Sequence, residues 1–229
     1  MQWHYDCTFA PQFYLIMLKN RTTIYILLAF FILLSGGFMA YYHKITREVP
    51  KRLPYIGEGD HKIRSFSFID QDGKTVTEKD IAGKIAVVEY FFTTCKGICP
   101  KMNDNMATVF DAFKGNKNIM ILSHTVDPKK DTVAALKEYS MRYSADPAQW
   151  KFLTGDKKEL YDMARYSYLI TAVDDTAAVD IQSDFIHSER FVLVDPSGHI
   201  RGSYNGTLKG DVQQLIGDIH ELMKEEKMR

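Results

Sequence analysis

The residues best suited to chemistry lie in the stretch TTCKGICP, residues 93–100. Cys95 and Cys99 are separated by three residues, and Pro100 follows the second cysteine. If a helix begins between them, the i,i+4 spacing places both sulfur atoms on the same side of one turn. Such a pair can close as a disulfide or share one soft metal ion. The unpaired amide groups at a helix start would also favour a thiolate over a thiol.

Two thiolates do not complete a metal site; a closed zinc site, for example, needs four ligands. Of the seven histidines, two lie where a site could form. His124 follows a hydrophobic run, and His187 follows the polar segment 172–184, which we interpret as a surface loop. Loops on rigid scaffolds often carry functional residues, whereas Met102 and Met106 recur at helical spacing and are expected in the core. The residues alone leave the third ligand open.

The composition excludes two broad classes of protein. Lys+Arg and Asp+Glu both number 29, so the chain lacks the basic excess typical of a nucleic-acid binder. Three cysteines are too few for a disulfide framework. Cys7 lies far from the other two and before the apolar run described below. Cys95 and Cys99 therefore indicate a site rather than a scaffold of disulfides.

Alternating hydrophobic segments predict an α/β domain over residues 61–229. We expect hairpins at 65–77 and 190–204, buried strands at 85–92 and 118–126, and a short strand at 151–155. Helices are expected at 100–115, 131–143, 157–166 and 208–223. The cysteine pair then follows the carboxyl end of a strand, which is where open α/β sheets place their sites.

The segment Ile24 to Tyr42 predicts a membrane anchor. It holds 19 residues without a charge, a length of about 28 Å in a helix, close to the ~30 Å hydrocarbon core of a bilayer. A cleaved signal peptide is the alternative. We expect a short cytoplasmic N-terminus over 1–23, whose true start could be Met17, and a solvated linker over 43–60. Four basic residues after the apolar run against two before it favour a cytoplasmic domain.

Several stretches in the same order resemble the Sco/SenC family of copper proteins, which are membrane-tethered and thioredoxin-like. The resemblance covers roughly residues 53–225. Asp127 and Asp131 match the family's DPxxD pattern, and we expect them to serve as turn and helix-cap residues. The matching stretches are FFTTCKGICPKMNDNM (91–106), TVDPKKDT (125–132), WKFLTG (150–155) and DFIHSERFVLVDPSGHIRGSYNGT (184–207).

The resemblance implies a thioredoxin-like fold with an N-terminal β-hairpin extension, and a specific site. Cys95 and Cys99 correspond to the family's copper-binding cysteines, and His187 to its copper-binding histidine, so the implied cargo is Cu(I) or Cu(II). Many family members carry an acidic residue immediately before that histidine, where this chain has Ile186. Asp184 is the nearest acid, so this chain departs from the family at the position of a carboxylate that would support the histidine.

The implied function is that of a metallochaperone in cytochrome c oxidase assembly. It would deliver copper to the CuA site of subunit II or reduce the cysteines of that site. The family's domain faces the periplasm from the bacterial inner membrane, which overrules the charge count above. Two alternatives remain open: a metal-independent, membrane-bound thiol–disulfide oxidoreductase, which would be an enzyme, and a copper or redox sensor.

Overall fold

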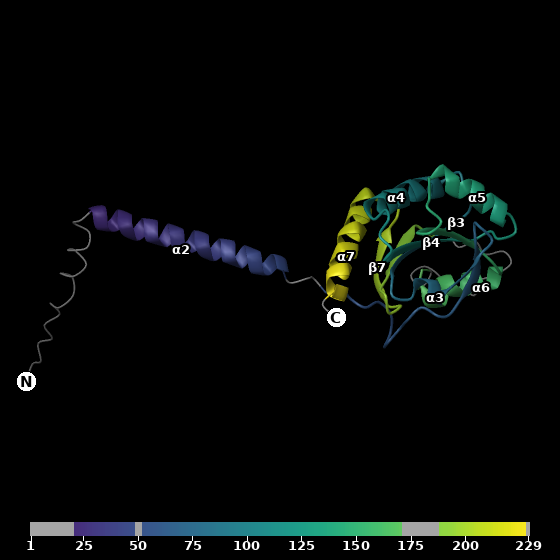
Figure 1. Cartoon of the computed structure of the whole chain (residues 1–229), viewed down its shortest axis with the longest axis horizontal. Coiled ribbons are helices and arrows are strands. Elements are labelled where there is room, and N and C mark those ends of the chain that lie inside the picture. The colour runs from purple at the N-terminus through teal and green to yellow at the C-terminus, as the bar shows by residue number, and fades with distance from the viewer. Residues whose placement is uncertain (1–20, 49–51, 171–187, 228–229) are drawn as a thin grey trace, which may run out of the picture. The chain divides into compact units, whose positions relative to one another are not determined.

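The computed structural model describes residues 21–48, 52–170 and 188–227. These residues form two compact units that divide between Pro50 and Lys51. The described part of the first unit is one helix, α2, and the second unit is an α/β domain (Figure 1).

Helix α2 spans Arg21–Glu48. Its stretch from Arg21 to Ile45 is long and apolar enough to cross a membrane, and none of its most apolar window is buried against protein. By length and composition this helix is a candidate membrane anchor. It extends past Tyr42, so the first residues of the expected linker are helical.

The described part of the α/β domain contains a seven-stranded sheet in the order β2-β1-β5-β4-β3-β6-β7. Strands β3, β4 and β5 are parallel to one another, and the outer strands pair antiparallel. The predicted hairpins form the two edges, β1–β2 and β6–β7. The strands are β1 Ser67–Asp70, β2 Thr75–Thr77, β3 Ile85–Phe91, β4 Ile119–Thr125, β5 Trp150–Thr154, β6 Arg190–Val194 and β7 Ile200–Asn205.

Helices cover both faces of this sheet, with α4 and α5 on one face and α3 and α6 on the other (Figure 1). Strand β3 is buried along its whole length: Val87 and Phe91 face one core cluster, whereas Val88 and Tyr90 face the other. The predicted α/β architecture is confirmed. The helices are α3 Glu78–Ile81, α4 Ile98–Ala112, α5 Val133–Arg142, α6 Lys157–Asp162, the π-helix η1 Met163–Ser167 and α7 Lys209–Lys227.

Helix α5 begins at Val133, two residues later than the sequence predicts. Its N-cap is Thr132, whose side chain accepts a hydrogen bond from the Ala135 amide. The cap expected at Asp131 is therefore wrong, and the Asp131 carboxylate is used elsewhere. Asp127 does form the expected turn, because its carbonyl accepts bonds from the amides of Lys130 and Asp131.

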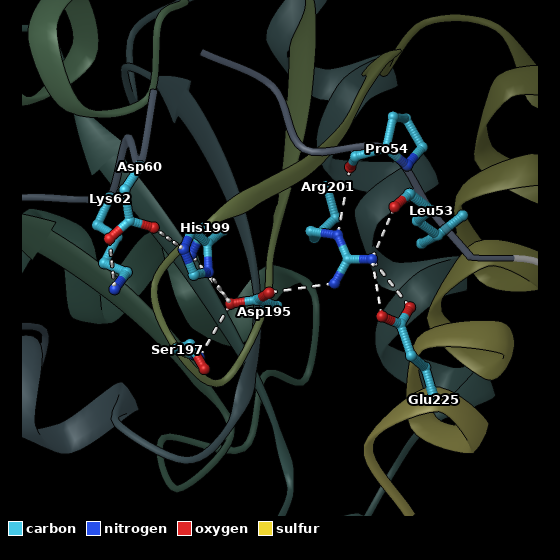
Figure 2. A network of polar contacts seen from close by, with 9 residues as sticks. All are labelled: Leu53, Pro54, Asp60, Lys62, Asp195, Ser197, His199, Arg201 and Glu225. Carbon is cyan, nitrogen blue, oxygen red and sulfur yellow. Dashed lines mark hydrogen bonds and ion pairs between the residues drawn. The ribbon is translucent and has the colours of Figure 1, made fainter. Parts of the chain in front are cut away.

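A buried arginine on β7, Arg201, bonds both to the first residues of the α/β domain and to its last helix, α7 (Figure 2). Arg201 is almost completely inaccessible. It donates to the carbonyl oxygens of Leu53 at 2.7 Å and Pro54 at 3.2 Å, and it pairs with Asp195 at 3.1 Å and Glu225 at 2.9 Å. Because two carboxylates and two carbonyls surround it, the guanidinium is well satisfied despite its burial.

The segment after Pro54 also packs on the domain. Ile56 forms an isolated bridge with Ile200. The ring of His199 contacts Asp60 at 2.8 Å, and Lys62 pairs with the same carboxylate at 3.1 Å (Figure 2). From the segment that the sequence predicts as a linker, Leu53, Pro54, Ile56 and Asp60 thus contact the α/β domain, while most of the residues from 52 to 60 are exposed.

We predict that Arg201→Met strongly destabilises residues 51–229. The substitution leaves the Asp195 and Glu225 carboxylates buried without their cation, and breaking a buried pair costs about 3–5 kcal/mol. Urea unfolding measures the loss. Arg142→Met is the control, because Arg142 pairs with Glu138 on the surface and should change the unfolding free energy by less than about 1 kcal/mol. Equal effects of the two substitutions would contradict the prediction.

Candidate metal centre

The cysteine pair lies between the end of β3 and the first turn of α4. Cys95 is in the connecting loop and half-buried, with its amide bonded to the Phe92 carbonyl at 3.2 Å. Cys99 is in the first turn and only 3% exposed. Both are free thiols, and Gly97 is the residue that precedes the helix. The structure thus places the pair at a helix start, where the sequence predicts it.

The pKa values of the two thiols are shifted in opposite directions. Burial tends to raise the pKa of Cys95, but hydrogen bonds from the Cys99 thiol and from the amides of Cys99, Gly97 and Ile98 outweigh it, so the pKa of Cys95 is lowered. Burial raises the pKa of Cys99 to about 12, and its bond to Cys95 adds to that rise. Cys95 is therefore the more acidic of the two thiols and the better nucleophile, while Cys99 holds its proton more tightly.

A buried carboxyl group, Glu89 on β3, lies in the core behind the cysteines. It is completely inaccessible. One oxygen accepts a bond from the Ser123 hydroxyl at 2.6 Å, and Ser123 in turn accepts from the Trp150 indole at 2.9 Å. The other oxygen has no partner among the described residues. Burial raises the pKa of Glu89 to about 8, so the group is largely protonated at neutral pH.

Glu89 also influences the cysteine pair, because a negative charge on it would raise the pKa of Cys99 further. The sequence interpretation did not single it out. The available signal was a single charged residue inside the otherwise apolar run IAVVEYFF (85–92), since an acid in a strand buried on both faces is rare without a specific environment.

We predict that Glu89→Gln flattens the dependence of stability on pH. The folded state keeps the Glu89 proton up to about pH 8, whereas the unfolded chain releases it near 4.5. Unfolding therefore releases a proton in this window, and stability falls as pH rises through it. Relative to Glu89→Gln, the wild-type domain should lose on the order of 3 kcal/mol between pH 4.5 and 7. Denaturant titrations at several pH values measure this difference, and parallel curves for the two proteins would refute it.

The histidine at 124 does not join the cysteines. It lies at the end of β4, where its ring is completely buried. It stacks on Tyr90 with centroids 5.0 Å apart and meets Phe68 and Tyr168, each at 5.4 Å. These rings belong to the core cluster on one face of the sheet, whereas Cys99 belongs to the cluster on the other. His124 is therefore not a third ligand.

The environment of His124 is apolar, and neither ring nitrogen has a hydrogen-bond partner among the described residues. Burial lowers its pKa to about 3. We predict that His124→Leu makes the domain more acid-resistant, because only the unfolded chain gains a proton at this histidine between pH 6.5 and 3. The wild type should lose on the order of 1 kcal/mol per pH unit of acidification relative to the variant. Acid unfolding followed by circular dichroism tests this, and an unchanged midpoint would contradict it.

The remaining predicted ligand, His187, lies outside the described residues, as do Asp184 and Ile186. Within the described ranges, no cluster of three or more His, Cys, Asp or Glu side chains could hold a metal ion. Among the described residues, the predicted site is therefore represented by two free thiols, Cys95 and Cys99, and the metal-binding roles of these cysteines and of His187 stay predictions.

A mixed sheet with helices on both faces and a dithiol at the start of a helix defines a thioredoxin-like domain, here extended at one edge by the β1–β2 hairpin. The family model described as SCO1/SenC matches residues 56–224. The chain therefore belongs to the SCO1/SenC family.

Individual relatives agree with this assignment. The SCO1 protein homolog of Bacillus subtilis is 29% identical over 162 residues, covering 70% of this chain and 82% of the relative. The structure of BsSco, described as a Sco-family cytochrome c oxidase assembly protein with a disulfide switch, is 28% identical with a TM-score of 0.60, covering 76% of this chain and 97% of its own. ScoI of Arabidopsis thaliana with copper bound is 27% identical with a TM-score of 0.54, covering 71% of this chain and 98% of its own.

Proposed function

We propose that this chain is a membrane-anchored copper metallochaperone that serves the CuA site of cytochrome c oxidase. The observation that carries the proposal is the free Cys95–Cys99 pair at the start of α4, with one acidic and one buried thiol. A related protein has been solved with copper bound, and another is described as an oxidase assembly protein.

Copper would be the cargo of this protein. Cu(I) prefers soft sulfur ligands, and the Cys95 thiolate is the first such ligand available to it. Cys99 would release its proton on binding, so uptake should become easier as pH rises. His187 would supply an imidazole as the third ligand. A three-ligand site leaves the ion open to attack by the thiols of an acceptor, as transfer requires.

The same two thiols support a second candidate function, reduction of a disulfide in the acceptor. The Cys95 thiolate would attack the acceptor disulfide and form a mixed disulfide, releasing one acceptor thiol. Cys99 would then lose its proton and attack Cys95, releasing the second acceptor thiol and leaving a Cys95–Cys99 disulfide. The observation that favours this function is the pairing of a more acidic, more exposed thiol with a buried one.

The proposed location follows from the candidate anchor α2. We propose that α2 is retained as a single span in a bacterial inner membrane and that the α/β domain faces the periplasm, where the copper-binding part of oxidase subunit II would be the acceptor. The segment before α2 would then lie in the cytoplasm.

We predict that the reduced protein binds about one copper ion and that Cys95→Ser, Cys99→Ser and His187→Ala each weaken binding at least tenfold, because each removes one ligand. Competition titration with a chromophoric Cu(I) chelator measures the affinity. His220→Ala is the matched control, because His220 is exposed on α7 and should leave the affinity unchanged. Wild-type affinity in His187→Ala would remove the third ligand from the proposal.

The same variants separate the two functions. A metal-free reductase should retain its rate on a disulfide substrate in His187→Ala, whereas a metallochaperone should lose copper transfer in that variant. Turnover that survives in Cys99→Ser would contradict the reductase mechanism, because that variant cannot resolve the mixed disulfide.

A further inference from the structure

Three buried polar atoms that lack a hydrogen-bond partner lie together in the aromatic cluster around His124. Both ring nitrogens of His124 and the hydroxyl oxygen of Tyr168 have no partner among the described residues, and both side chains are almost completely inaccessible. The centroids of the two rings are 5.4 Å apart. Tyr90 in the same cluster differs, because its hydroxyl group donates to the Leu160 carbonyl at 2.9 Å. Since buried polar groups are normally hydrogen-bonded, His124 and Tyr168 are candidates for contact with a bound molecule.

A cavity lies beside this pair, between residues 64–68 and the segment formed by α6 and η1. Its volume is about 450 Å³, within the range of roughly 300–1,000 Å³ that is typical of small-molecule sites. Phe66, Phe68 and Met163 line it with buried apolar side chains. The same two phenylalanine rings meet the ring of His124 edge to face, with centroids 6.3 and 5.4 Å away. They therefore form a shared wall between the cavity and the histidine.

The charged side chains that line the cavity favour a neutral ligand over an ion. Arg64 comes from the strand side of the cavity, and Glu159 and Asp162 come from α6. The Arg64 guanidinium lies over the ring of Tyr166, 5.4 Å from its centroid, and Asp162 pairs with Lys158 at 2.6 Å. An apolar interior with a few polar groups around it is the usual composition of a small-molecule site.

The segment that carries Tyr168 has two unusual backbone features. The helix η1, Met163–Ser167, is a π-helix, and Leu169 has a φ of 54°, in the left-handed region that few residues other than glycine adopt. Features of both kinds concentrate at functional sites. The carbonyl of Met163 accepts the Tyr168 amide at 2.9 Å. One short segment thus supplies both a wall of the cavity and one of the unpartnered polar groups.

We propose that this cavity binds a small, neutral aromatic molecule that carries a hydroxyl group. The ring of the ligand packs on Phe66, Phe68 and Met163, and its hydroxyl group reaches between the two phenylalanine rings to His124 and Tyr168. A hydroxyl group can donate one hydrogen bond and accept two, which matches an imidazole nitrogen that accepts and a tyrosine hydroxyl that donates.

The ionisation of the two side chains agrees with this role. Burial lowers the pKa of His124 to about 3, so its imidazole is uncharged at neutral pH and keeps one acceptor nitrogen. Burial raises the pKa of Tyr168, so its hydroxyl group keeps the proton that it donates.

This site is separate from the cysteine pair. His124, Phe66 and Phe68 pack in the core on one face of the sheet, whereas Cys99 belongs to the core cluster on the other face. The proposal therefore does not depend on the proposed function, and a failure of the protein to bind copper would leave it standing.

Methyl NMR of the full-length chain in lipid nanodiscs tests the proposal with two probes, phenol and toluene. Methionine methyl groups are labelled with carbon-13, and the signal of Met163, assigned through Met163→Leu, reports occupation of the cavity. Phenol should shift this signal in a saturable way. His124→Leu should weaken phenol binding by about three- to tenfold, the loss of roughly one hydrogen bond, and should change toluene binding by less than about twofold. Partition of each probe into the lipid is common to all variants and cancels in this comparison.

His220→Leu is the matched control, because it removes an exposed histidine on α7 and should leave both titrations unchanged. Tyr168→Phe removes the second polar group and should weaken phenol binding by about two- to fivefold, which keeps the test decisive if His124→Leu fails to fold. A Met163 signal that neither probe shifts would overturn the proposal. So would equal phenol binding by the wild type and the folded variants, or equal weakening of phenol and toluene, which would indicate a purely apolar cavity.

Discussion

The burial of β3 on both faces is the constraint on which the rest of the structure depends. Its seven residues are all inaccessible, so one layer of helices must cover each face. Parallel pairing with β4 aligns the carboxyl ends of the two strands, and the cysteine loop leaves the sheet at that edge. The site is therefore a consequence of how the central strands are covered.

Burial inside the domain also determines how many hydrogen-bond and ion-pair partners its charged groups need. Arg201 is surrounded by two carboxylates and two carbonyls, and Asp131 receives bonds from two threonines. Glu89 has one donor, Ser123, and one oxygen without a partner among the described residues. Because a buried charge needs several partners, Glu89 is the carboxyl that burial pushes toward its neutral form.

The sequence was sufficient for features that depend on local pattern. Short β-branched and aromatic runs predicted β3 and β4 nearly to the residue, and the CxxxC spacing with Pro100 predicted a helix start at the cysteines. The family resemblance was carried by motifs in order along the chain, and the match to residues 56–224 confirms it.

Features that depend on contacts between distant segments could not be predicted from the local sequence pattern. The Arg201 bond to Leu53 joins residues 148 apart, and nothing near either residue signals it. Which face His124 occupies depends on the register between β3 and β4, where it lies opposite Tyr90. Since side chains alternate along a strand, a shift of one residue would have turned the histidine toward the cysteines.

The two cysteines lie at one helix start, but their surroundings shift the pKa values of their thiols in opposite directions. At the same turn, amide groups stabilise negative charge on the Cys95 sulfur while burial opposes it on the Cys99 sulfur. A pair of equally acidic thiols would place two negative charges side by side, which is unfavourable without a metal ion. Two thiols of unequal acidity avoid that repulsion, because the one with the lower pKa ionises first while the other keeps its proton. The unequal burial of Cys95 and Cys99 thus separates the pKa values of two thiols that lie at one helix start.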